Sequence, residues 1–166
     1  MLEATGLKLD RTLSPAEICK SQMNPGIYLE KIWSDDDALE IQIHSSDGAS
    51  VFCSHVYAGH QSLTNLITEL SVFKDHVYGG IYDIQLGSFG PEYASGAFHA
   101  RLHFQTLSKI HITVKAQSEF KEFGMKHVAS EATLYFVSEP ILLDNFIAEL
   151  KALSTGMRND AKLEAA

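Results

Sequence analysis

The sequence predicts an α+β protein: a mostly antiparallel sheet of about six to seven strands, or two abutting sheets, with two amphipathic helices on one face. Two observations lead to this fold class. Short segments of strand character follow one another with only turns between them, which favours antiparallel pairing over β-α-β units. An apolar helical motif also occurs twice, at residues 63–70 and again 80 residues later at 143–150. The expected order of elements is β-β-β-α-β-β-β-β-α.

Each copy of the motif carries one apolar stripe at helical spacing, as in a helix that lies on a sheet. The first helix is expected over about 62–77 with Ser62 as its cap, and the second over about 140–154, with Pro140 in its first turn and Gly156 at its end. Two related halves, each a meander closed by a helix, explain the repeat as well as convergence on a common helix pattern does. The stripes are Leu63, Leu66, Ile67, Leu70, Phe73 and Val77, and Leu143, Phe146, Ile147, Leu150 and Leu153.

Strands are predicted at about 27–33, 38–44, 50–57, 81–86, 97–105, 110–117 and 132–137, with an irregular segment at 120–126. The clearest hairpin joins 97–105 to 110–117. A three-residue turn at 106–108 would place Phe104 beside Ile110 and His103 beside His111, so that apolar side chains share one face. A two-residue turn at 107–108 would shift the register, so that apolar side chains of one strand would share a face with polar side chains of the other.

A chain of 166 residues is expected to be a single domain, with an N-terminal extension at 1–24, a core at 25–156 and a frayed tail at 157–166. A short helix is expected near Ser14-Pro15-Ala16-Glu17. The apolar runs are too short to span a membrane, and the start lacks the features of a secretion signal. Cys19 and Cys53 have no metal-type spacing, which favours a reduced, cytoplasmic protein.

The charge of the chain is unevenly distributed. The net charge of −8 argues against nucleic acid as a partner. Residues 93–118 nevertheless contain no acidic residue and carry +3, which leaves −11 for the rest of the chain. In the favoured register, five of their side chains share one sheet face: His99, Arg101, His103, His111 and Lys115. Several interpretations of this face stay open. It is an ordinary solvated surface, an anion site, or a surface that docks an acidic partner such as a second copy. It is alternatively a zinc site of three histidines, which the positive charge of Arg101 disfavours.

An acidic cluster lies around the first predicted hairpin, where Lys31 is the one cation: Glu30, Asp35, Asp36, Asp37, Glu40 and Asp47. It favours a basic protein partner, which such charges steer into contact. It lacks the spacing of an EF-hand calcium loop, and a solvated turn would have the same composition. Four aromatic side chains rim a pocket or simply pack: Trp33, Tyr57, Tyr78 and Tyr82.

No standard catalytic or nucleotide-binding motif occurs in the sequence. Cys53 and His55 lie on the same strand face, but a catalytic pair usually comes from different elements, so a structural Cys53 is the simpler interpretation. We therefore expect a non-catalytic binding protein with no cofactor and no metal.

Several segments resemble small bacterial immunity proteins of polymorphic and contact-dependent toxin systems, including the WapA type. They are Ser62-Leu63-Thr64-Asn65-Leu66-Ile67 with Glu69-Leu70, Gly79-Gly80 before a strand, Lys109-Ile110-His111-Ile112-Thr113-Val114, and Glu139-Pro140 with Leu143, Phe146 and Leu150. The resemblance covers about residues 27–154 and implies a cytoplasmic protein that binds one toxin domain and neutralises it by occlusion.

The resemblance identifies no toxin-contact residue, so the acidic set of Glu30, Asp35, Asp36, Asp37 and Glu40 remains the expected contact surface. Two alternatives stay open. One is a small-ligand or metal-binding, enzyme-like domain that uses the His99, His103 and His111 face. The other is a homodimeric structural module that pairs through a sheet face.

Overall fold

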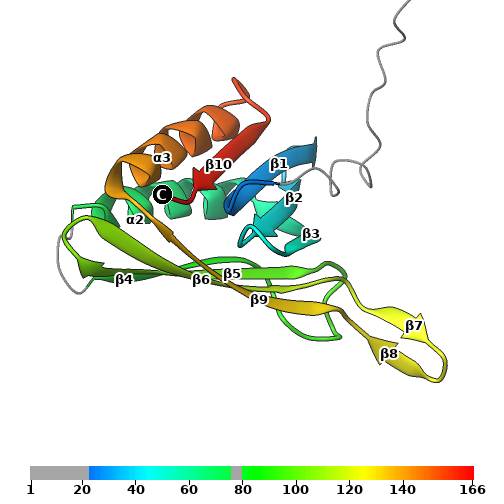
Figure 1. Ribbon diagram of the computed structural model, residues 1–166. Coiled ribbons are helices and arrows are strands. Elements are labelled where there is room, and N and C mark those ends of the chain that lie inside the picture. The colour runs from blue at the N-terminus through cyan, green and yellow to red at the C-terminus, as the bar shows by residue number, and fades with distance from the viewer. Residues whose placement is uncertain (1–22, 76–79) are drawn as a thin grey trace, which may run out of the picture.

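The computed structural model describes residues 23–75 and 80–166, which form an α+β structure with two helices and mostly antiparallel sheets (Figure 1). The helix expected near Ser14, and Cys19, Val77 and Tyr78, lie outside the described residues. Neither described helix has the length and apolar character needed to cross a membrane.

The described strands form two four-stranded sheets and one hairpin, and all pairs are antiparallel. The first sheet has the order β10-β1-β2-β3, from β1 (Gly26–Ser34), β2 (Ala38–Ser46), β3 (Val51–Gly59) and β10 (Asp160–Glu164). The second sheet has the order β4-β5-β6-β9, from β4 (Ile81–Gly87), β5 (Ala97–Thr106), β6 (Lys109–Gln117) and β9 (Glu131–Ser138). The hairpin consists of β7 (Lys121–Phe123) and β8 (Lys126–Val128).

All seven predicted strands are present, but the predicted strand count and order are incomplete. Ten strands form in the described residues, because the segment expected to be irregular forms β7 and β8 and the tail expected to fray forms β10. The tail is held because β10 pairs with β1 and buries Ala161 and Leu163. Its alternation of apolar residues is too short, and Ala161 too small, to stand out in the sequence.

The predicted register of the β5–β6 hairpin is confirmed. Phe104 lies opposite Ile110 and His103 opposite His111. The predicted three-residue turn is wrong, because Thr106 pairs with Lys109 and a two-residue turn at 107–108 follows a bulge between Phe104 and Thr106. The bulge adds the one residue that restores the match between the apolar faces.

Both predicted helices are present, but the first begins at His60 and ends at Phe73 instead of spanning about 62–77. The first, α2 (His60–Phe73), begins two residues before Ser62, follows Gly59 and has no side-chain cap. The second, α3 (Pro140–Ser154), has the expected Pro140 start, and Gly156 follows it with a φ of 78°. That left-handed conformation suits a glycine at a helix end.

The chain contains two units with the order β-β-β-α-β. The first unit is β1, β2, β3, α2 and β4, and the second is β5, β6, β9, α3 and β10. The last strand of each unit joins the sheet of the other. After α2 the chain enters β4, which pairs with β5; after α3 it enters β10, which pairs with β1. The pair Gly26–Ser46 of the first unit corresponds to Ala97–Gln117 of the second, 71 residues later, with buried side chains at matching positions.

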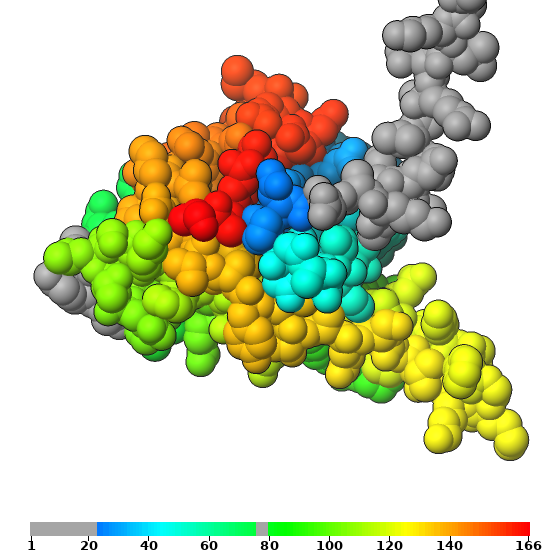
Figure 2. All heavy atoms as spheres, viewed as in Figure 1, coloured from blue at the N-terminus to red at the C-terminus, as the bar shows by residue number. Residues whose placement is uncertain are grey.

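The third strand and the helix recur 80 residues later, and the nine additional residues lie in the β7–β8 segment. We call residues 118–130 the arm. The first unit has only the short turn of residues 47–50 at the equivalent place. The arm projects beyond the body of the molecule (Figures 1 and 2), and Phe123 and Met125 near its tip are 71% and 103% exposed.

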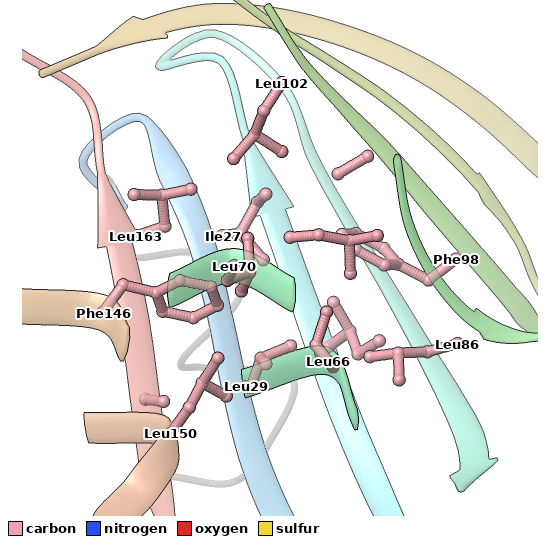
Figure 3. Close-up of a cluster of buried hydrophobic side chains, with 14 of the residues drawn as sticks. Ile27, Leu29, Leu66, Leu70, Leu86, Phe98, Leu102, Phe146, Leu150 and Leu163 are labelled. Atoms are coloured by element: carbon pink, nitrogen blue, oxygen red, sulfur yellow. The ribbon is translucent and has the colours of Figure 1, made fainter. Parts of the chain in front are cut away.

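One hydrophobic core lies between the inner faces of both sheets and the two helices. Leu66 and Leu70 of α2 and Phe146 and Leu150 of α3 point toward side chains of β1, β4, β5 and β10 (Figure 3). Every stripe residue predicted within the described residues is buried, so the predicted helix faces are confirmed.

Replacement of either fully buried helix leucine should strongly destabilise the fold. Leu70→Ala and Leu150→Ala each leave a cavity and should lower the free energy of unfolding by about 2–5 kcal/mol in denaturant titrations. Ile141→Ala is the control, because Ile141 is 60% exposed on α3. A loss below about 0.5 kcal/mol for either leucine, the size of a surface effect, would contradict the burial.

Candidate functional site

The loop between β1 and β2 is an ordered acidic turn. Asp35 Oδ1 accepts hydrogen bonds from the backbone N–H groups of Asp37 and Ala38, each at 2.9 Å. These two bonds lower the pKa of Asp35 below its ordinary value of 3.8. His60 Nε2, at the start of α2, lies 2.7 Å from the Asp35 carbonyl oxygen. Asp35 therefore builds the turn, and Asp36 and Asp37 are exposed beside it.

The outer face of the first sheet joins these carboxylates to two exposed aromatic rings. Trp33 lies opposite Glu40 on β2, and Glu40 lies opposite Tyr57 on β3, so the three side chains form one row across the sheet. Trp33, the single tryptophan of the chain, is 47% exposed and Tyr57 is 48% exposed. We call this surface the acidic face: Glu30, Trp33, Asp36, Asp37, Glu40 and Tyr57.

Like charges meet at one edge of the acidic face. Glu30 lies opposite Asp160 of β10, and two carboxylates in opposite positions of a sheet repel each other. The equivalent pair in the second unit is Arg101 opposite Asp83, which is an ion pair. Asp160 is partly balanced by Arg158, at 3.0 Å. Its place beside Glu30 was missed from the sequence because β10 was expected to fray.

The structure separates Asp47 from the predicted acidic cluster and Tyr82 from the other predicted pocket aromatics. Asp47 follows the opposite end of β2, roughly 30 Å from the loop for a nine-residue strand, and its carboxylate accepts bonds from Ala49 and Ser50. Tyr82 lies on β4, where its hydroxyl donates to Glu69 of α2 at 2.8 Å. Trp33 and Tyr57 thus share one sheet face with Glu40 between them, and Tyr82 lies on the other sheet.

Cys53 lies in the polar centre of the same sheet face. Its sulfur accepts a hydrogen bond from Gln42 at 3.2 Å and lies 4.0 Å from His44 Nε2. Burial lowers the pKa of His44, which favours the neutral ring. His55, the predicted neighbour on the strand, instead places Nδ1 3.4 Å from Glu40. The histidine beside the thiol therefore comes from a different strand, which the spacing along β3 did not reveal.

All five residues predicted to share the second polar face do so, on the outer side of the second sheet. His103 lies opposite His111, and His99 opposite Lys115. Asp83 of β4, which was not predicted on this face, accepts two hydrogen bonds from Arg101, at 2.8 and 2.9 Å, and lies 3.0 Å from His99 Nε2. Among residues 23–75 and 80–166, no three histidine, cysteine or acidic side chains converge as a metal site requires.

The Arg101–Asp83 pair should make stability depend on pH. The Arg101 hydrogen bonds, with a smaller contribution from His99, lower the pKa of Asp83 below 3.8. A carboxyl group whose pKa is lowered by folding stabilises the fold when it is ionised. This stabilisation is fully present above the pKa of the unfolded state and is lost as the pH falls through the pKa of the folded state. Asp83→Asn should therefore cost roughly 0.2–1 kcal/mol at about pH 7 and less at about pH 2 in thermal unfolding experiments, because the advantage of the carboxylate declines below its unfolded pKa.

The control for this experiment is Glu122→Gln on β7, which removes an exposed carboxylate that has no ion pair among the described residues. It should leave stability unchanged at both pH values. If the effect of Asp83→Asn were the same at neutral and acid pH, its cause would lie outside the ionised pair.

Comparisons with known proteins identify no relative: no family model, no curated protein and no solved structure matches the chain.

Proposed function

We propose that the chain is a non-catalytic binding protein whose acidic face binds a basic protein domain. The row of Trp33, Glu40 and Tyr57 carries this proposal, because it places two half-exposed aromatic rings around a carboxylate. Tryptophan and tyrosine supply a large share of binding energy at protein interfaces. The surrounding carboxylates favour basic partners and accelerate their approach.

The charge arrangement of the face supports the same proposal. Glu30 and Asp160 lie opposite each other, although the fold accommodates an ion pair at the equivalent position of the second unit. Their repulsion opposes folding and would be relieved by a partner's cation between them. The residues lie on strands and on a turn fixed by Asp35, so little conformational freedom would be lost on binding.

Within this class we propose an immunity protein that acts in the cytoplasm and neutralises one toxin domain by occlusion. The sequence resemblance suggests the family, and the acidic face provides a surface for a basic toxin. Occlusion needs no catalytic group or cofactor of the chain. A toxin domain encoded by a neighbouring gene is the first partner to test.

Expression of that toxin domain with this chain should allow cells to survive. Trp33→Ala with Tyr57→Ala should abolish protection, because loss of two interface aromatic side chains typically weakens binding by at least about 2 kcal/mol. The control is Tyr135→Ala, which removes a 67% exposed aromatic ring from β9 of the second sheet. Protection by the double variant equal to that of the wild type would exclude the acidic face as the contact surface.

Neutralisation of the loop charges should slow association without weakening the fold. Asp36→Asn with Asp37→Asn retains Asp35, which the turn requires, and should leave thermal stability unchanged or slightly raised because repulsion decreases. Its association with the toxin domain should be several-fold slower at low salt, and the difference should shrink as salt shortens the Debye length.

The matched control is Glu92→Gln with Glu122→Gln, which removes the same charge from exposed positions outside the acidic face. Stopped-flow measurements across a salt series compare the two variants with the wild type. Equal rates and equal salt slopes for all three proteins would show that the loop is a solvated turn, and that the partner binds elsewhere.

A further inference from the structure

A small cavity lies where the acidic face meets the base of the arm. Its volume is about 240 Å³, and its polar lining comes from β3, its neighbour β2 and two distant segments: Glu40, His55, Tyr57, Ser95, Ser118 and Glu119. This volume is below the roughly 300–1,000 Å³ of pockets that bind whole small molecules. It suits the end of one side chain of a partner.

The wall opposite β3 is held in place by a close backbone approach at Gly96. The Gly96 N–H donates to the His55 carbonyl oxygen at 2.9 Å. A Cβ atom at this position would lie 2.5 Å from the Gln117 carbonyl oxygen and 2.9 Å from that of His55, so a larger residue would push the segment away. Glycine at position 96 therefore brings Ser95 against β3.

The arm provides the rest of this wall. Ser118 and Glu119 are its first residues, and the first unit has only the short turn of residues 47–50 in place of the arm. The Ser118 N–H donates to the Ser130 carbonyl oxygen, and the Ser118 hydroxyl accepts a bond from the Ser130 N–H, each at 2.9 Å. These bonds fix the base of the arm beside the cavity. The extra segment thus adds polar groups at the border of the acidic face.

The cavity offers hydrogen-bond acceptors and negative charge. Glu40 and Glu119 both line it, and the described lining residues include no lysine or arginine. Ser54 of β3 also lines it.

We propose that this cavity receives the guanidinium group of an arginine from the partner. A guanidinium presents five N–H donors in one plane, pairs with carboxylates and stacks on aromatic rings such as Tyr57. Glu40 and Glu119 neutralise its charge, and the hydroxyls of Ser95 and Ser118 accept its remaining N–H groups. This inference rests on the proposed function, because it names the side chain that the acidic face recognises.

Binding of N-acetylarginine amide to the full chain tests the proposal, followed by NMR shifts of backbone amides. Saturable shifts at His55, Tyr57 and Ser118 are expected at millimolar ligand concentrations. Glu119→Gln should weaken this binding about tenfold, as expected for loss of a charge-assisted hydrogen bond. The matched control Glu122→Gln, farther along the arm, should bind like the wild type.

Two further ligands test the choice of group. N-acetylcitrulline amide has the same shape without the charge and should not bind, and N-acetyllysine amide should bind more weakly than the arginine ligand. Equal binding of the lysine and arginine ligands, binding of the citrulline ligand, an unaffected Glu119→Gln variant or absence of saturable shifts would each overturn the proposal.

The failure of this inference differs from the failure of the proposed function. If arginine amide binds as expected but the acidic-face variants still protect cells, the cavity remains a guanidinium site and the toxin-binding face is wrong. If protection depends on Trp33 and Tyr57 but arginine amide does not bind, the face remains and the cavity assignment is wrong.

Discussion

The fold depends on the pairing of each unit's last strand with the first strand of the other unit. β4 completes the sheet that contains β5, and β10 completes the sheet that contains β1. Both sheets and both helices therefore enclose one core instead of two small ones. A larger shared core buries a greater fraction of apolar surface, which stabilises a chain of this size. This arrangement also explains why the C-terminal tail is ordered.

The two units use equivalent backbone positions for opposite charges on their outer faces. Glu30 of β1 and Arg101 of β5 occupy corresponding sites, each opposite an aspartate on the strand contributed by the other unit. The second unit forms an ion pair there, whereas the first places two carboxylates side by side. Because the inner face of each strand is required for the core, the outer faces are where the units differ in surface chemistry.

The arm extends this difference beyond the sheets. The first unit shows that the third strand can follow the second through a short turn, so the longer connection of the second unit is not needed to close its sheet. Its base adds Ser118 and Glu119 to a cavity that Glu40 and Tyr57 already border. The acidic face and the arm thus form adjacent parts of one recognition surface in the function we propose.

The sequence alone determined the local structure and the side chains available at the surface. Periodicity predicted seven strands, both helix stripes and the register of the β5–β6 hairpin, because these depend on neighbours in the chain. Tertiary structure decided that there are two sheets, that β10 pairs with β1, and that Asp83 meets Arg101. It also placed Trp33 and Tyr57 on either side of Glu40, and Glu40 and Glu119 at one cavity. Such arrangements join residues far apart in sequence, and they follow from how the strands pair around the shared core.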